Sequence, residues 1–351
     1  ASFFIGSDSI LFSKPNNRKE AYHYINNTGR IECNLCPNGC FISNNKTGDC
    51  KTRRNINGKL YTIAYNNPCA INIDPIEKKP LYHFLPQTKS YSLAIAGCNF
   101  TCLNCQNWSI SQFSPDETQN YFITSQQIVE SCLKNDCKSI SYTYSEPVVF
   151  YEYMFDTAKL AKSKGIKNIM VSNGYINQKP LKNLTKFIDA ANIDLKAFDD
   201  STYKKLCGGS LKPVLDTLIT LKQEKVWLEI TNLIVPSWTD DFTKIKDMCN
   251  WLAKNNFSET PLHFSRFSPM YKLTQLPPTP FSSLEKAANI AKDAGINYVY
   301  IGNVPGTQFE STFCPNCQKL LIERKGFWII SNNLNNGKCK FCSQKINGIW
   351  S

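Results

Sequence analysis

The stretch Leu93-Ala94-Ile95-Ala96-Gly97-Cys98-Asn99-Phe100-Thr101-Cys102-Leu103-Asn104-Cys105 joins an apolar run to three closely spaced cysteines. The run predicts a buried strand, so the cysteines lie in the loop that leaves it. Cysteine thiolates are the usual ligands of iron–sulfur clusters, which normally take four of them. Three cysteines without a nearby fourth therefore favour a [4Fe–4S] cluster with one iron open for chemistry. A zinc knuckle with a distant fourth ligand and thiols without metal are the alternatives.

Strand-like and helix-like segments alternate along the chain on both sides of this loop. Residues 139–144 are β-branched and aromatic, for example, and Thr124 with Gln127 forms a capping box at the start of a helix. Strands that alternate with helices of 10–15 residues indicate a parallel α/β sheet. Six or seven such units fit a partial (βα)6-type TIM barrel over residues 83–307, because a closed barrel needs eight.

Polar side chains recur where the expected strands end. They are Cys98, Glu146, Asn173, Asp194, Lys196 and Asn303. In parallel β/α folds the active face lies at the carboxyl ends of the strands. A helix cap or a surface turn would explain any single residue of this set. Their shared position on one edge favours a common site.

Residues 1–82 form an N-terminal extension in which residues 33–50 are rich in cysteine. Four cysteines, Cys33, Cys36, Cys40 and Cys50, fall within this short segment. Glycine and proline between them let the chain turn back, so the four thiols can close a tetrahedral site. Zinc is the first interpretation and a second iron–sulfur cluster is the next, because sulfur ligation alone does not separate the two. Thiols without metal remain the third.

The chain changes character at residue 308. Cys314 and Cys317 are followed, after 21 residues, by Cys339 and Cys342. This paired spacing is typical of a zinc ribbon. We therefore expect residues 308–351 to form a small zinc-ribbon-like module that zinc holds folded. A rubredoxin-like iron site has the same spacing.

Composition sets broader limits on the protein. The 351 residues include 16 cysteines, mostly in tight steps, which favours metal ligation in a reducing compartment over disulfides. No apolar run reaches the roughly 20 residues of a membrane span, and no secretory signal is evident, so we expect a cytoplasmic protein without a membrane partner. The net charge of +12 is scattered along the chain. A solvated basic surface explains it better than a nucleic-acid partner.

The three-cysteine loop resembles the C-x3-C-x2-C signature of radical S-adenosylmethionine (SAM) enzymes. The longer string from Ala96 to Trp108 resembles the radical SAM enzymes of the AmmeMemoRadiSam system, relatives of the pyruvate formate-lyase (glycyl radical enzyme) activating enzymes. Supporting strings are residues 74–81, 143–147, 194–196, 231–236 and 298–306. The resemblance covers roughly residues 30 to 350.

The resemblance implies a radical SAM oxidoreductase in which a [4Fe–4S] cluster on Cys98, Cys102 and Cys105 cleaves SAM. The resulting 5′-deoxyadenosyl radical abstracts hydrogen from a substrate that the sequence does not identify. The cofactor carries the chemistry and the protein orients it, so no residue is assigned a catalytic role of its own.

Further residues acquire expected roles by position in the same family. Glu146 would hold the SAM amino group and Lys196 the SAM carboxylate, with Asp194 beside it. Asn173 and His263 would contact the ribose or adenine, although His263 could equally be a hydrogen-bonded core histidine. Two departures weaken a strict glycyl-radical role. Tyr144-Ser145 replaces two glycines, and Val171-Ser172-Asn173-Gly174 replaces the Asp-Thr-Asn-Gly of the activases, whose aspartate helps bind a monovalent cation.

The implied partners are a flavodoxin- or ferredoxin-type electron donor and, from the family association, Memo-like and AMMECR-like proteins. Two other functions remain open at this point. One is a radical SAM enzyme that modifies RNA or a metabolite, and the other is a multi-zinc binding scaffold without catalysis.

Overall fold

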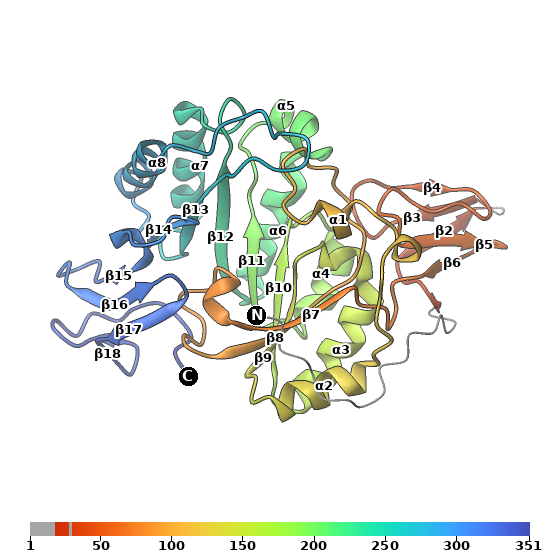
Figure 1. Cartoon of the computed structure of the whole chain (residues 1–351), viewed down its shortest axis with the longest axis horizontal. Coiled ribbons are helices and arrows are strands. Elements are labelled where there is room, and N and C mark those ends of the chain that lie inside the picture. Colours follow the sequence, from red (N-terminus) through yellow and green to blue (C-terminus); the bar gives the residue numbers. More distant parts are fainter. Residues whose placement is uncertain (1–17, 28–29) are drawn as a thin grey trace.

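The computed structural model describes residues 18–27 and 30–351. Figure 1 shows a central sheet covered by helices, with a small β-rich module at each end of the molecule. We call residues 19–62 the N-terminal module and residues 308–351 the C-terminal module. Within the described part of the chain, no helix is both long and apolar enough to cross a membrane.

The central sheet contains eight strands in the order β14-β13-β12-β11-β10-β9-β8-β7. Seven of them run parallel, and β7 pairs antiparallel with β8 at one edge. They are β7 (Ala70–Pro75), β8 (Lys89–Ala94), β9 (Ser139–Tyr142), β10 (Lys167–Ser172), β11 (Ala190–Asp194), β12 (Trp227–Ile234), β13 (Leu262–Arg266) and β14 (Val299–Gly302). The sheet stays open between β7 and β14, so the fold is a partial barrel, as the alternating pattern predicts.

The edge strand β7 lies before residue 83, where we expect the barrel to begin. Asp74-Pro75 indicates a break in the sequence, yet Pro75 pairs with Lys89 as the last residue of the strand. Proline is tolerated there because β7 lies at the edge of the sheet, where a missing N–H breaks no interior ladder.

The helices between the strands cover the outer face of the sheet (Figure 1). The longer ones are α2 (Ser125–Lys134), α3 (Tyr151–Ser163), α4 (Gln178–Thr185), α6 (Leu211–Gln223), α7 (Phe242–Lys254) and α8 (Phe281–Asp293). Short helical segments are η1 (Ile76–Lys78), α1 (Trp108–Ser111), η2 (Pro115–Glu117), η3 (Pro147–Phe150), α5 (Asp200–Thr202), the π-helical η4 (Tyr203–Cys207) and η5 (Gln308–Glu310). Thr124 forms the expected capping box with Gln127 at the start of α2.

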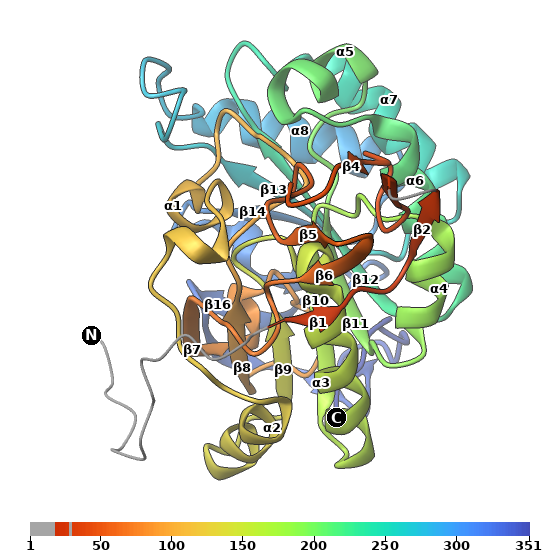
Figure 2. The same ribbon diagram turned by 90° about the vertical axis from the view of Figure 1, so that its right-hand side faces the viewer.

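The N-terminal module consists of two three-stranded sheets, β1-β6-β5 and β2-β3-β4. Its strands are β1 (Lys19–Glu20), β2 (Tyr24–Asn27), β3 (Arg30–Cys33), β4 (Phe41–Ile42), β5 (Arg53–Ile56) and β6 (Lys59–Thr62). Figure 2 shows the module beside α3 and α4. Its buried apolar residues, Leu35 and Ile42 among them, are continuous with the core of the barrel.

The C-terminal module has a separate small core. Its strands are β15 (Thr312–Phe313), β16 (Leu320–Lys325), β17 (Trp328–Asn332), β18 (Leu334–Asn335) and β19 (Lys338–Cys339). Leu321 and Ile322 pack there with Tyr298 and Tyr300 near the last barrel strand. This small core includes aromatic side chains of the barrel region, and main-chain hydrogen bonds between residues 83–85 and Ile349 also join the module to the barrel.

Candidate functional site

The Cys98 loop (residues 95–107) leaves the carboxyl end of β8. Its backbone is held by a segment far away in the sequence, because Thr101 N donates to Cys207 O and Leu103 N donates to Leu206 O, both at 2.9 Å. These acceptors lie in η4, a π-helical turn. Such turns are frequent at functional sites. The loop is thus fixed in place by two main-chain hydrogen bonds.

Two glycines let other segments approach this loop closely. Gly97 has φ +111°, and a Cβ there would lie 2.6 Å from Cys50 O. A Cβ on Gly209 would lie 2.2 Å from the ring of Phe100. Any larger residue at either position would push the loop away from its neighbours. The N-terminal module and the segment after η4 therefore hold the loop on two sides.

The three thiols of the loop all have polar neighbours. Phe100 N donates to Cys98 Sγ at 3.3 Å, and Cys105 Sγ lies 3.1 Å from Ser111 Oγ. The thiol of Cys207 lies beside Cys102 and, together with the charge of Lys196, lowers the pKa of Cys102. The sequence pattern does not indicate Cys207, because it lies alone and far from the other cysteines.

Glu146 follows β9 and is almost completely buried, with 3% of its surface exposed. One carboxylate oxygen accepts from Ser172 Oγ at 2.7 Å and Val148 N at 3.0 Å, and the other accepts from Asn173 N at 2.8 Å. Burial raises the pKa of Glu146 to about 7, against the opposing effect of these donors. Burial raises the pKa of the Cys98 thiol, and the negative charge of the Glu146 carboxylate raises it further.

Asn173, at the end of β10, links Glu146 to the Cys98 loop. Its side-chain amide donates to Asn99 Oδ1 at 2.8 Å and lies 3.9 Å from Cys98 Sγ. Asn99 in turn donates to Tyr175 O at 2.8 Å. The ends of β8, β9 and β10 therefore form one hydrogen-bonded unit around Cys98.

Lys196 and Asp194 form an ion pair at the end of β11. The Lys196 Nζ to Asp194 Oδ2 distance is 2.8 Å, and both side chains are partly exposed. Burial opposes the charge of Lys196, but Asp194 and the neighbouring Cys102 raise its pKa above the usual value. Tyr203 OH accepts from Lys196 N at 3.1 Å and so ties the pair to η4. Lys196 is thus a cation next to the thiol of Cys102.

Asp74 of β7 and Lys79, which follows η1, form a buried ion pair that contacts the turn before Glu146. Asp74 accepts from Lys79 at 2.5 Å and also from the hydroxyl of Tyr144. Tyr144 has φ +66°, a conformation that glycine adopts more readily. The hydrogen bond from its hydroxyl and the Lys79 ammonium, 4.5 Å from the ring centroid, hold a tyrosine in this turn. Sequence reasoning singled out the string 74–81 but not this role for it.

His263 has surroundings different from those of the other candidate residues. Its Nε2 lies 2.7 Å from Glu229 Oε2, and its ring lies against Tyr82 and Tyr300. These tyrosines belong to the core of the C-terminal module. Of the two roles that the sequence leaves open for His263, these contacts favour the hydrogen-bonded core histidine over a nucleoside contact beside Glu146.

The two outer cysteine groups are arranged differently from each other. In the C-terminal group, Cys314 Sγ lies 3.6 Å from Cys342 Sγ, and Cys317 Sγ lies 3.7 Å from Cys339 Sγ. All four sulfurs lie within 4.8 Å of one another, and among the described residues no other group of potential ligands converges in this way. Cys33, Cys36, Cys40 and Cys50 instead line a small cavity. The two groups therefore differ in how closely their sulfurs converge.

Comparison with known proteins identifies the central region. The model of the Radical SAM superfamily matches residues 93–251, which include the Cys98 loop, Glu146 and Lys196. The uncharacterized protein MJ0808 of Methanocaldococcus jannaschii is 50% identical over 319 residues, which cover 90% of this chain and 95% of that protein.

More distant relatives include the pyruvate formate-lyase-activating enzyme of Clostridium pasteurianum, 24% identical over 45% of this chain and 67% of that enzyme. A putative glycyl-radical enzyme activating enzyme of M. jannaschii, MJ1632, is 28% identical over 46% of this chain and 63% of that protein. Among solved structures, a radical SAM methyltransferase from Sphaerobacter thermophilus superposes with a TM-score of 0.49 at 9% identity, over 62% of this chain and 66% of that one.

Proposed function

This chain belongs to the radical SAM superfamily, in one family with the uncharacterized protein MJ0808, and we propose that it cleaves SAM reductively to abstract hydrogen from a substrate. The observation that carries the proposal is the hydrogen-bonded unit that joins the Cys98 loop to Glu146 and Asn173. The relation to glycyl-radical activating enzymes favours an activase-like reaction.

The residues of the Cys98 loop fit a cluster with three protein ligands. Cys98, Cys102 and Cys105 are free thiols on one loop, and the sulfurs of Cys98 and Cys105 have polar contacts with Phe100 N and Ser111 Oγ, respectively. Polar contacts of this kind tune the potential of such clusters. A [4Fe–4S] cluster bound here would supply the single electron that breaks the sulfonium bond of SAM.

The protein's own contribution is to bind and orient SAM. Glu146 would accept from the SAM ammonium group through a charge-assisted hydrogen bond. Three donors already hold the Glu146 carboxylate in one orientation, so its position is fixed before SAM arrives. Lys196 would pair with the SAM carboxylate and exchange its bond to Asp194 for the new one.

Asn173 holds the two halves of the proposed site in register. Its backbone N–H binds Glu146, and its side chain binds Asn99 next to Cys98. A shift of about 1 Å in such a site is enough to slow a reaction about 100-fold. Asn173 therefore acts as a positioning residue between the carboxylate and the cysteine loop.

Formation of 5′-deoxyadenosine tests the proposal. The protein is reconstituted anaerobically with iron and sulfide, then mixed with SAM and dithionite. We expect 5′-deoxyadenosine from the wild type and from Cys249→Ala, which removes a buried thiol outside every cysteine group. Cys102→Ala should give none. Equal product from Cys102→Ala and the wild type would overturn the proposal, as would its absence from an iron-loaded wild type.

A further inference from the structure

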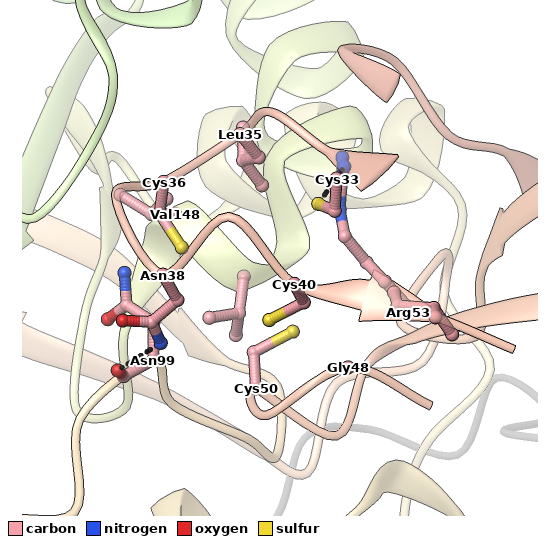
Figure 3. A pocket seen from close by; sticks show the side chains of 12 residues that line it. Cys33, Leu35, Cys36, Asn38, Cys40, Gly48, Cys50, Arg53, Asn99 and Val148 are labelled. Atoms are coloured by element: carbon pink, nitrogen blue, oxygen red, sulfur yellow. Dashed lines mark hydrogen bonds between the residues drawn. The ribbon is translucent and has the colours of Figure 1, made fainter. Parts of the chain in front are cut away.

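The four cysteines of the N-terminal module surround a cavity next to the barrel. Figure 3 shows the sulfurs of Cys33, Cys36, Cys40 and Cys50 directed toward this space from different sides. The cavity is small: the centre of a water molecule could move within a volume of about 10 Å³. Apolar side chains such as Val148 and Val149 form part of its wall. A space of that size holds about one water molecule, but apolar walls give a water few partners.

The spacing of the four sulfurs distinguishes a site for a single zinc ion from a site for an iron–sulfur cluster. A zinc–sulfur bond is about 2.3 Å long, so four sulfurs around one zinc stand about 3.8 Å apart and leave no room between them. The C-terminal cysteines, at 3.6 and 3.7 Å, match that arrangement. Among the described residues, only the C-terminal cysteines form a group of three or more potential ligands whose atoms all lie within 4.8 Å of one another. No three of the N-terminal sulfurs are that close, so they do not have the spacing of ligands around a single zinc ion.

An iron–sulfur cluster requires this wider spacing. Each cysteine binds an iron at the edge of the cluster, so inorganic sulfide and iron fill the space between the ligand sulfurs. A buried cation is also present, because Arg53 Nη1 donates to Cys33 Sγ at 3.4 Å while the guanidinium pairs with buried Glu152. Hydrogen bonds to the ligand sulfurs and burial are the means by which proteins set cluster potentials.

The N-terminal site lies directly against the Cys98 loop. Asn38, two residues after Cys36, donates from its side chain to Asn99 O at 3.1 Å. Asn99 is the residue next to Cys98 and also lines the cavity. On the other side, Thr52 Oγ1 donates to Val149 O at 2.7 Å and anchors the module near Glu146. One hydrogen bond therefore separates the chain segments of the two cysteine groups.

We propose that Cys33, Cys36, Cys40 and Cys50 bind an iron–sulfur cluster that passes electrons to the cluster of the Cys98 loop. A low-potential one-electron carrier protein reduces the N-terminal cluster by one electron. That electron then moves to the cluster at Cys98, which is reduced while the N-terminal cluster returns to its oxidised state. The relay rests on the proposed function, whereas the identity of the N-terminal cluster does not.

Metal analysis tests the identity of the cluster separately from activity. The variant Cys98→Ala/Cys102→Ala/Cys105→Ala cannot assemble the cluster of the loop. After anaerobic reconstitution we expect it to keep about four iron atoms per chain with equal sulfide, or about two for a [2Fe–2S] cluster. The further variant that adds Cys36→Ala and Cys50→Ala should contain none. If the triple variant contained no iron and a second zinc ion per chain, the assignment of an iron–sulfur cluster to the N-terminal cysteines would be wrong.

The choice of reductant tests the relay. Cys36→Ala/Cys50→Ala should cleave SAM with dithionite, a small reductant that reaches the loop cluster itself, but at least about tenfold more slowly than wild type with reduced flavodoxin. Cys132→Ala/Cys249→Ala, which removes two other buried thiols, should match the wild type with both reductants. Equal rates for the two variants with flavodoxin would overturn the relay. If Cys36→Ala/Cys50→Ala fails to fold, Arg53→Lys replaces it, because Arg53 donates to Cys33 Sγ. We expect the rate of SAM cleavage with reduced flavodoxin to change while the rate with dithionite stays at the wild-type value. Unchanged rates with both reductants would contradict the relay.

Discussion

The two outer cysteine groups use the same ligands in opposite structural settings. The C-terminal sulfurs converge tightly inside a module with its own small core. The N-terminal sulfurs surround a cavity, and three of the four cysteines belong to the core of the barrel. A metal at the first site would hold together a small unit of its own. A metal at the second is part of the same packed interior as the Cys98 loop.

The difference shows that spacing in the sequence specifies ligands but not their occupant. Both groups contain a Cys-x2-Cys step, in Cys33–Cys36 and Cys314–Cys317. Only the distances between the sulfurs, and what lies between them, separate a single ion from a cluster. Four predictions test this contrast between a separate C-terminal module and an N-terminal module that is part of the barrel core.

The largest effect is expected from Cys317→Ala. We propose that the C-terminal group binds zinc, in which case loss of one ligand should release a metal whose binding contributes on the order of 10 kcal/mol to the folding of such small modules. Amides of β16 and β17 should then exchange at nearly the unprotected rate, while those of β10 stay protected. Hydrogen exchange with mass spectrometry and zinc analysis measure both. Protection of β16 equal to that of Cys249→Ala would show that the module does not depend on the metal.

Arg53→Met should have the next largest effect, a loss of stability in the N-terminal module. It leaves Glu152 as a buried charge without its partner, which typically costs about 3–5 kcal/mol. Native-state hydrogen exchange of β5 amides reports the free energy of local opening. Arg53→Met/Glu152→Leu should recover most of the loss because it removes both charges. A loss below about 1 kcal/mol in the single variant would contradict the integration of this module into the barrel.

Gly209→Ala should disturb the Cys98 loop from the side opposite the N-terminal module. The added Cβ would overlap the ring of Phe100, and overpacking of this kind costs up to about 3 kcal/mol. We expect faster loss of iron from the loop cluster under a chelator. Gly165→Ala, where nothing lies within 4 Å of the new Cβ, serves as the control for backbone strain. Equal iron loss in both variants would contradict the close approach.

The smallest effect is a pH dependence at the C-terminal module. Burial lowers the pKa of His83 to about 4, and its ring contacts Asn347 O and Tyr300 OH. Because the unfolded histidine takes up a proton near pH 6.5, stability is present above that value and lost as pH falls toward 4. Between pH 7 and pH 5 the free energy of opening should fall by about 2 kcal/mol.

Exchange of the Leu85 and Ile349 amides measures this opening, since each is bonded across the junction. His83→Gln should flatten the response. His23→Gln, which removes a histidine with a similarly lowered pKa in the N-terminal module, should leave it intact. A response that persists in His83→Gln would assign the pH dependence to another group.

Much of the barrel follows from the sequence because its strands and helices have clear periods. Residues 139–142 form the expected strand, which ends before Thr143 and Tyr144, and Thr124 caps the expected helix. The short edge strand β7 could not be predicted, since its pairing with β8 depends on tertiary structure and Pro75 is unusual in a strand.

The residues of the candidate site could also be predicted only in part. Position at strand ends was enough to group Glu146, Asn173 and Lys196. Cys207 could not be found in that way, because only the π-helical turn brings it to Cys102. The sequence left two roles open for His263, because Glu229, the partner that favours the core role, lies 34 positions away on the neighbouring strand.

The hydrogen bonds that join residues 83–85 to residue 349 also constrain how the protein is made. Leu85 N donates to Ile349 O, Ile349 N donates to His83 O, and the His83 ring reaches Asn347 across 264 positions of the chain. While the ribosome is still synthesising the barrel, these groups have no partner. These contacts can therefore form only after nearly the whole chain has emerged, so residues 83–85 reach their final hydrogen bonding at the end of synthesis.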